Sequence, residues 1–342
     1  MYTNFPTKFL YANWFKGLAI SRILWYNERV ACERRISPVK IPAFEKTNML
    51  TSTPRERLTS RPVVVLLLFL VTLTAAEVGR VLLAIPCTLL IPNSLSGSTS
   101  MLISLFATLA TVAVVLIYCL AIERRTLLSL GFIRRGAVAE YAIGLAAGLG
   151  LFGLPVLLCV VTGAMSLSPA ESMPSLGLLL LFFIGFLIQG MSEELLCRSY
   201  LMVSLARKWP LWACAVANAL LFSLIHLGNP GVTVTALVNI FLFGFFASML
   251  TLRRGSIWMV GAIHSMWNFA QGNLFGIPVS GLVGSPSPLV AEVGEGKWQT
   301  LVNGGSFGLE GGLAVTAVLA AACVVVAFAS TKRSEVVNES IE

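Results

Sequence analysis

Two adjacent carboxylates and two histidines lie inside apolar stretches of this 342-residue chain, and they are the side chains best suited to chemistry there. The carboxylates are Glu193 and Glu194, and His226 and His264 are the only two histidines of the sequence. Placing an ionisable group in membrane hydrocarbon costs at least about 2.5 to 3.5 kcal/mol, so such groups are commonly functional. These residue types perform general acid–base catalysis, which predicts an active site inside a membrane.

A glutamate pair and an arginine form the first motif. Glu194 and Arg198 are four residues apart, so on a helix they share one face and are expected to form an ion pair. That pair neutralises one carboxylate, whereas Glu193 points about 100° away around the helix. Glu193 is therefore predicted to be the carboxylate that is free to act as a general base.

Two further motifs bring a histidine next to a second side chain. Phe222 precedes His226 by four residues, so on a helix the aromatic ring is expected to pack against the imidazole and fix it. His264 and Asn268 have the same spacing and present an imidazole and an amide together. Two such hydrogen-bonding groups suit the oxyanion that develops when a carbonyl is attacked, because preorganised donors stabilise it in a water-poor site.

The elements that carry these residues are predicted to be membrane helices. Hydrophobic residues make up 56% of the chain and charged residues only 12%, and the mean hydropathy is +0.84, unlike the composition of a soluble domain. We therefore expect an all-α fold, a polytopic bundle of about eight transmembrane helices in an integral, multi-pass membrane protein. The apolar segments are residues 63–86, 101–121, 141–165, 176–205, 211–226, 232–252, 257–275 and 313–330.

Basic residues indicate how the bundle is oriented. Lys and Arg cluster before the first segment and after every second one, whereas the intervening loops contain one basic residue, Lys297. The positive-inside rule then places both termini in the cytoplasm. Residues 1–61 hold 11 Lys and Arg against four Glu, but positive charge directly before a membrane helix is a normal cytoplasmic flank. No nucleic-acid partner is therefore expected.

These patterns divide the chain into three regions. A basic N-terminal extension covers residues 1–61, the transmembrane bundle covers residues 62–331, and a cytoplasmic tail covers residues 332–342. Within the bundle, residues 176–275 are the predicted catalytic core. The extension is interpreted either as an interfacial amphipathic helix or as sequence that precedes a true start at Met49.

The ordered motifs Glu-Glu-x-x-x-Arg, Phe-x-x-x-His and His-x-x-x-Asn resemble those of the CPBP/Abi intramembrane proteases, which include the type II CAAX prenyl endopeptidases. The resemblance implies hydrolysis of a peptide bond within or at the edge of the bilayer. It implies that Glu193 activates a water molecule with help from His226, while His264 and Asn268 stabilise the tetrahedral oxyanion. The residues that would support the site are Glu194, Arg198 and Phe222.

Several alternatives stay open at the level of sequence. No metal is assigned, but zinc is the alternative cofactor, because Glu193, His226 and His264 are residue types that bind catalytic zinc. The absence of a His-Glu-x-x-His helix favours the metal-free reaction. The substrate is expected to be a peptide or membrane protein, prenylated or not, in the lipid bilayer. A non-catalytic membrane scaffold or immunity protein and a proton-coupled transporter are the alternative functions.

Overall fold

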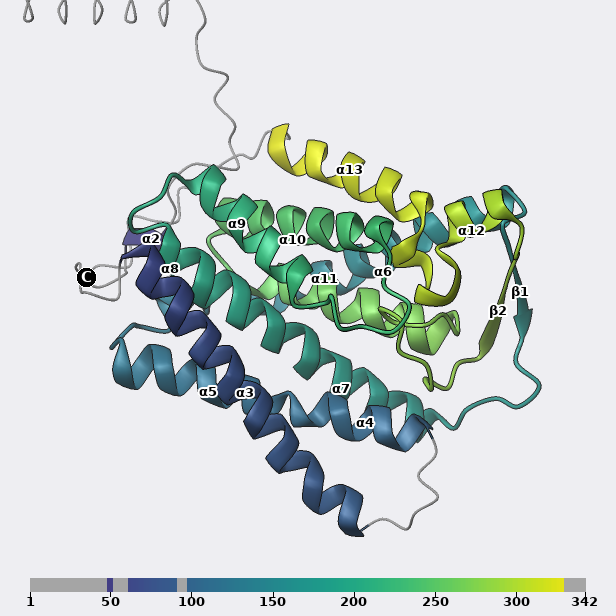
Figure 1. The fold of residues 1–342 in the computed structure, drawn as a ribbon, viewed down its shortest axis with the longest axis horizontal. Helices are drawn as coiled ribbons and strands as arrows, with labels where there is room; N and C mark the ends of the chain where they lie inside the picture. The colour runs from purple at the N-terminus through teal and green to yellow at the C-terminus, as the bar shows by residue number, and fades with distance from the viewer. Residues whose placement is uncertain (1–47, 52–60, 91–96, 329–342) are drawn as a thin grey trace, which may run out of the picture. The chain divides into compact units, whose positions relative to one another are not determined.

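The computed structural model describes residues 48–51, 61–90 and 97–328, all within the compact unit Pro42–Glu342. Most of these residues are helical (Figure 1). In chain order the helices are α2 (Asn48–Thr51), α3 (Pro62–Leu90), α4 (Gly97–Ala107), α5 (Leu109–Leu116), α6 (Ala137–Val161), α7 (Leu176–Glu194), α8 (Val203–Leu205), α9 (Leu211–Leu224), α10 (Val234–Arg254), α11 (Trp258–Phe269), α12 (Lys297–Asn303) and α13 (Leu313–Phe328).

The apolar segments predicted from the sequence are largely helical, but the expected count of about eight membrane spans is not confirmed. In the described part of the chain, five segments are long and apolar enough to cross a membrane: Pro62–Leu89, Gly97–Ile122, Ala137–Val161, Leu176–Leu205 and Val234–Arg254. The apolar helices α9 and α13 are shorter than the roughly 20 residues that a span needs. The predicted extension and tail lie outside the described residues, apart from α2 and Arg61.

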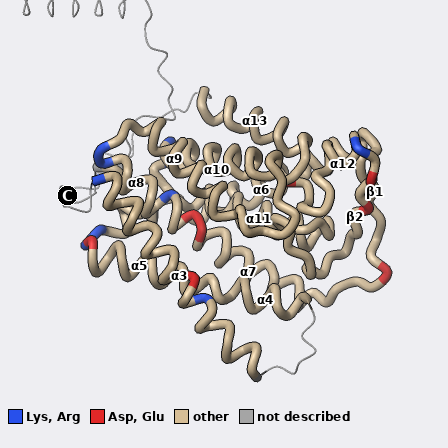
Figure 2. Tube along the Cα trace, in the orientation of Figure 1, with Lys and Arg blue, Asp and Glu red and all other residues tan. Residues whose placement is uncertain are grey.

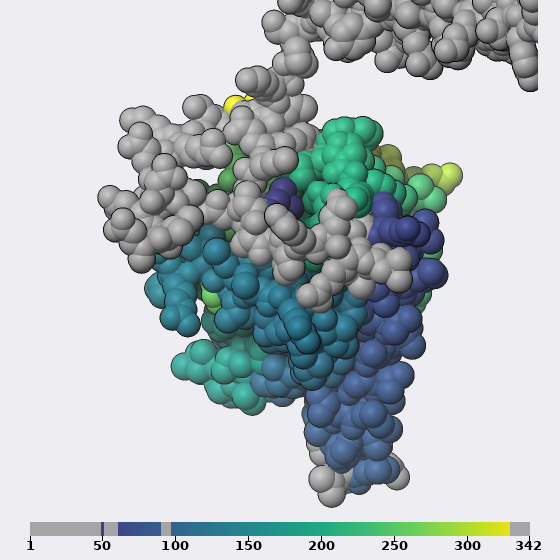
Figure 3. Space-filling view, turned by 90° about the vertical axis from the view of Figure 1, so that its left-hand side faces the viewer, coloured from purple at the N-terminus to yellow at the C-terminus, as the bar shows by residue number. Residues whose placement is uncertain are grey.

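Exposed apolar side chains suit contact with lipid. Val63, Leu82 and Leu89 on α3 are 68%, 63% and 79% exposed. Figure 3 shows α3 as a column that extends beyond the neighbouring helices. Figure 2 shows that charged residues lie mainly at the ends of the bundle, with acidic positions on α7 and α3 as exceptions in the middle. This distribution fits a membrane-embedded bundle with polar groups in its interior.

Two connections that were predicted to be loops form a small sheet. The strands β1 (Met165–Pro169) and β2 (Leu289–Val293) pair antiparallel, with Met165 opposite Val293. The amide of Asn303 donates to the carbonyls of Ala164 and Gly294, at 2.8 and 3.0 Å, and so holds the ends of both strands together. The all-α prediction is therefore wrong in this detail, because distant segments supply each other's backbone hydrogen bonds.

Local sequence explains where the site-bearing helices begin and end. Ser175 caps α7 by accepting a hydrogen bond from the backbone amide of Leu178, and Thr233 caps α10 in the same way. The fifth apolar segment was predicted to be helical to residue 226, but α9 ends at Leu224. Pro230 follows shortly, in a glycine-rich turn that does not continue the helix. His226 is therefore placed in a turn.

The helix that carries the glutamate pair changes its winding directly after it. α7 continues as a π-helical turn over Leu195–Met202, which leads into α8. The buried guanidinium of Arg125 donates to the carbonyls of Ser199 and Ser129, at 2.7 and 3.0 Å. These bonds anchor the π-helical turn to the connection between α5 and α6. Such turns occur frequently at functional sites.

Close approach of α7 and α11 forms the centre of the bundle. A Cβ atom on Gly190 would lie 2.5 Å from Ser265 Oγ and 2.7 Å from Ser265 N, so only glycine fits there. A Cβ atom on Gly261 would lie 2.6 Å from Met191 Cε. At Gly190 the contact is with backbone atoms, so glycine there allows the two backbones to approach, as is common between membrane helices, whereas at Gly261 it leaves room for the flexible side chain of Met191. This contact brings the glutamate pair of α7 to the histidine of α11.

Candidate active site

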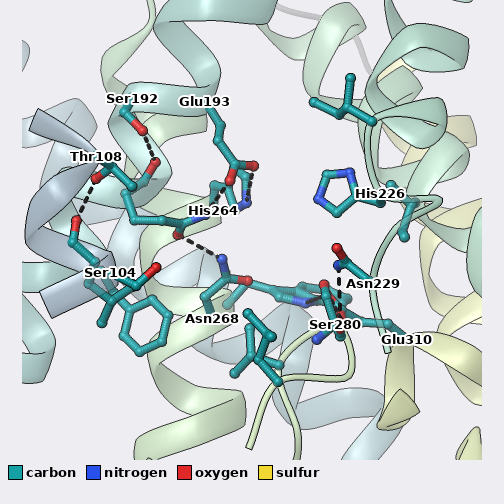
Figure 4. Close-up of a pocket in the computed structure, with 18 of the residues that line it drawn as sticks. Ser104, Thr108, Ser192, Glu193, His226, Asn229, His264, Asn268, Ser280 and Glu310 are labelled. Atoms are coloured by element: carbon teal, nitrogen blue, oxygen red, sulfur yellow. Dashed lines mark hydrogen bonds and ion pairs between the residues drawn. The ribbon is translucent and has the colours of Figure 1, made fainter. Parts of the chain in front are cut away.

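A cavity of about 630 Å³ lies between the helices, with walls from α3, α4, α7, α10, α11 and α13. The helices α5 and α9, the π-helical turn after α7, the turn after α9, the loop before β2 and Glu310 also contribute to its lining. Figure 4 shows side chains from these separate elements directed into one space. Four predicted catalytic residues share the cavity: Glu193, His226, His264 and Asn268.

Glu194 forms a fully buried ion pair and also binds an imidazole. Its Oε1 accepts hydrogen bonds from Arg198 Nη1 at 3.1 Å and from His264 Nδ1 at 2.8 Å. The side chains of Glu194 and Arg198 are both 0% exposed. The predicted ion pair is therefore present, and it holds the ring of His264 in one orientation.

Two contacts complete the surroundings of Arg198. Its Nη2 donates to the carbonyl of Gly244 at 3.3 Å. Its guanidinium carbon lies 4.4 Å from the centroid of the Phe222 ring, within cation–π distance. A buried ion pair is favourable only when further contacts replace the lost water, and here they do so in part, because Arg198 Nε and Glu194 Oε2 are buried without a hydrogen-bond partner among the described residues. Phe222 thus supports the arginine as well as the histidine that follows it.

Glu193 lines the cavity, and its two carboxylate oxygens differ in their contacts. Its Oε1 accepts a hydrogen bond of 2.6 Å from Gln189 Nε2. Its Oε2 has no hydrogen-bond partner and lies 3.7 Å from His264 Nε2. Gln189 Oε1 in turn accepts from Asn268 Nδ2 at 2.9 Å, so one amide joins the carboxylate to the asparagine. Gln189 was not predicted from the sequence, although its spacing of four residues from Glu193 was the available signal.

His226 lies across the cavity from Glu193 (Figure 4). Its Nδ1 is 2.7 Å from the carbonyl oxygen of Phe222. Because a carbonyl only accepts, Nδ1 must carry the proton in this contact, which leaves Nε2 of the neutral ring as an acceptor. The centroids of the Phe222 and His226 rings are 4.8 Å apart. The expected packing of ring against imidazole is therefore present, although His226 follows the helix.

Residues 175–270 match the family model described as Rce1-like: Type II CAAX prenyl endopeptidase Rce1-like. The match covers 96 of the 342 residues, and residues 175–270 are called the Rce1-like segment below for this similarity. The resemblance seen in the motifs is thereby confirmed, and all seven motif residues fall inside the matched range. No curated protein and no solved structure shows a significant match to the chain. With five apolar helices, the match indicates an integral membrane endopeptidase of the CAAX-protease type, with a peptide or protein substrate and a lipid environment.

Part of the cavity wall lies outside the Rce1-like segment, on elements that precede or follow it in the sequence. On α3, Arg80 Nη1 pairs with Glu77 Oε1 at 2.9 Å, as expected for residues spaced by three. Arg80 Nη2 also donates to Ser104 Oγ of α4 at 3.4 Å. All three line the cavity, so charged and hydroxyl groups continue from the glutamates toward α3.

A polar group on the other side of the cavity was not found from the sequence. Asn229, in the turn after His226, donates from Nδ2 to the carbonyl oxygen of Ser280 at 3.1 Å. Ser280 contacts the carboxylate of Glu310, and these three residues line the cavity near His226 (Figure 4). The residues are far apart in sequence, so only Asn229, three positions after a histidine of the Rce1-like segment, carried a local signal.

The side chains do not form a zinc site in this arrangement. Among residues 48–51, 61–90 and 97–328, no group of three or more His, Cys, Asp or Glu is placed to hold a metal ion. Glu193, His226 and His264 are therefore not arranged as a ligand set, and His264 Nδ1 already binds Glu194. We accordingly derive no step of the reaction through a metal.

Proposed function

We propose that this protein is an intramembrane endopeptidase in which Glu193 activates water for attack on a peptide carbonyl. The observation that carries the proposal is that Glu193, whose Oε2 has no hydrogen-bond partner in the described part of the chain, lines the cavity opposite His226, whose Nε2 can accept a hydrogen bond. A water molecule between these two acceptors can donate one hydrogen to each. Its oxygen lone pairs are then free to attack, as a hydrolytic nucleophile requires.

Glu193, His226, one water molecule and the peptide account for every proton and bond of the proposed reaction. Glu193 Oε2 takes a proton from the water while the water oxygen bonds to the carbonyl carbon, giving a tetrahedral oxyanion. His226 Nε2 orients the water through its second hydrogen. When the C–N bond breaks, Glu193 returns the proton to the amine nitrogen, which leaves as a neutral amine. The carboxylate and the imidazole end the cycle in their starting states.

His264 and Asn268 are assigned to the oxyanion. Asn268 Nδ2 uses one hydrogen for Gln189, so its second hydrogen is available to the cavity. His264 Nδ1 donates to Glu194, so Nε2 donates to the oxyanion when the ring is an imidazolium, a form that the nearby carboxylates of Glu193 and Glu194 stabilise. Loss of one oxyanion donor commonly costs about 2.7 to 4 kcal/mol of transition-state stabilisation.

The substrate proposed is a peptide or membrane protein cleaved close to the membrane, with a prenylated cysteine as one candidate feature. Internally quenched peptides with and without a farnesyl group would be added to purified protein in liposomes. Membrane fractions from cells with wild-type protein or with Glu193→Ala would also be compared for new peptide termini by mass spectrometry.

We expect termini that only the wild type produces, and purified wild type that cleaves a peptide carrying the same sequence. Glu193→Ala should fold and bind detergent normally but leave that peptide intact. Identical termini in both strains would refute the protease proposal. Cleavage of the farnesylated peptide alone would identify prenylation as part of recognition, and equal cleavage of both peptides would refute that part.

A further inference from the structure

We propose that Glu310 is a positioning residue for this site, joining the helix of Asn268 to the loop that faces it across the cavity. The expected effect of Glu310 on the reaction rate rests on the proposed function, whereas the hydrogen bonds that Glu310 forms do not depend on it. Glu310 lies outside the Rce1-like segment, only 9% of its surface is exposed, and it lines the cavity.

The carboxylate of Glu310 accepts four hydrogen bonds from two separate elements. Its Oε1 accepts from Trp267 Nε1 at 3.2 Å, and its Oε2 accepts from Gln271 Nε2 at 3.3 Å. Oε2 also accepts from the backbone nitrogen of Ser280 at 2.8 Å and from its hydroxyl at 2.7 Å. Only a carboxylate offers enough acceptor positions without a donor of its own, so an amide would not satisfy this set.

One side of this network is a tight turn. Val279 and Leu282 exchange backbone hydrogen bonds of 2.9 and 2.8 Å, and Ser280 and Gly281 between them have φ angles of 48° and 83°. Positive φ at both central positions defines a type I′ turn. A positive φ is unfavourable for serine and persists where surrounding contacts hold it. The two bonds from Ser280 to Glu310 provide that restraint.

The turn at Ser280 is hydrogen-bonded to the turn that carries His226. The carbonyl of Ser280 accepts from Asn229 Nδ2 at 3.1 Å, and Asn229 follows His226 by three residues. The backbone nitrogen of Asn229 donates to the carbonyl of His226 at 3.0 Å. Glu310 thus restrains Ser280, and Ser280 restrains the turn that carries His226.

The other side of the network reaches the proposed oxyanion residues. Trp267 directly precedes Asn268, and its ring centroid lies 5.6 Å from that of Phe243. Phe243 in turn contacts the ring of His264 at a centroid distance of 4.9 Å. An indole held by Glu310 therefore fixes the rotation of α11 and the packing against His264. Glu310 is the one side chain described that binds both Trp267 and Ser280.

Glu310→Gln tests this role, with Glu295→Gln as the matched control because Glu295 is an exposed glutamate of the same outer region. In Glu310→Gln we expect kcat to fall about tenfold, as is common for loss of one hydrogen bond to a charged group, with little change in KM. Trp267→Phe removes the indole donor but keeps an aromatic ring. If Glu310 acts through Trp267, adding Glu310→Gln to the Trp267→Phe variant should lower kcat by much less than tenfold.

A second readout does not depend on activity. In protein labelled with 5-fluorotryptophan, the resonance of Trp267 is assigned as the one that Trp267→Phe removes. Glu310→Gln should shift this resonance, and Glu295→Gln should not. An unshifted resonance, or a wild-type kcat in folded Glu310→Gln, would overturn the inference. If Glu310→Gln does not fold, Ser280→Ala replaces it, with the same expected fall in kcat, and a wild-type kcat would overturn the inference.

The experiments distinguish failure of the protease proposal from failure of the positioning role of Glu310. If wild type and Glu193→Ala behave alike toward every peptide, the protease proposal fails, while the fluorine resonance still decides the contact of Glu310. If wild type cleaves, Glu193→Ala does not, and Glu310→Gln cleaves normally, only the positioning role is refuted.

Discussion

Replacing Gly190 by alanine is expected to separate α7 from α11 and to break the hydrogen bond between Glu194 and His264. The new Cβ atom would lie 2.5 Å from Ser265 Oγ, 2.7 Å from Ser265 N and 2.9 Å from Ser265 Cα. Ordinary contact begins at 3.4 Å, so the 2.7 Å contact with Ser265 N requires the backbones to move apart by about 0.7 Å. The clash includes backbone atoms, so side-chain rotation does not relieve it.

That movement is large compared with the tolerance of the site. The bond from His264 Nδ1 to Glu194 Oε1 is 2.8 Å, and lengthening it by about 0.7 Å takes it beyond the usual limit of about 3.2 Å for such a bond. Misplacement of catalytic groups by about 1 Å commonly costs a factor of about 100 in rate. Overpacking of this kind destabilises by roughly 1 to 3 kcal/mol. We therefore expect Gly190→Ala to lower kcat/KM about 100-fold and to lower the melting temperature.

The assay is cleavage of an identified substrate peptide by protein in liposomes, with thermal unfolding measured on the same samples. Gly177→Ala is the matched control, because Gly177 is on the same helix and a Cβ atom there meets nothing within 4 Å. Ser265→Gly in the Gly190→Ala background removes the Oγ contact only, so little activity should return. Wild-type activity and stability in Gly190→Ala would refute the claim that this contact positions the site.

Three other changes test separate parts of the site. Glu193→Gln should lower kcat about 100- to 10,000-fold while the protein stays folded, because a general base contributes a factor of that size; activity close to wild type would refute its role. Arg198→Ala leaves the buried Glu194 with His264 as its remaining partner and without the arginine charge, and should reduce the free energy of unfolding by roughly 3 to 5 kcal/mol, measured by thermal or denaturant unfolding in detergent. Stringent removal of metal with a chelator should leave cleavage unchanged, because the described side chains form no metal-binding group; activity that is lost and then restored by zinc would contradict this.

Local spacing predicted the contacts that are local in the structure. Glu194 and Arg198 form the expected ion pair at 3.1 Å, because residues four apart on helical backbone are neighbours wherever the helix packs. The same holds for Phe222 and His226, whose rings are 4.8 Å apart. Gln189 had this spacing too and was overlooked, because an amide carries no charge that sets it apart in a membrane helix.

The contacts that join distant segments followed from no pattern along the chain. Glu194 and His264 are 70 residues apart, and their bond depends on glycine at the crossing of α7 and α11. The pairing of β1 with β2 also followed from no local pattern. The register of the two strands depends on where the helices between them place the loops that carry the strands.

By itself the sequence determined that the chain is helical and apolar, which residues carry ionisable groups into that environment, and which pairs share a helix face. Those properties depend on composition and on the 3.6-residue period alone. The tertiary structure decided that Glu193 Oε2 has no hydrogen-bond partner among the residues described, that His226 lies in a turn, and that Glu310 joins two walls. These features depend on how side chains from separate helices fill a shared space, because long-range packing is specified by shape and hydrogen bonding together.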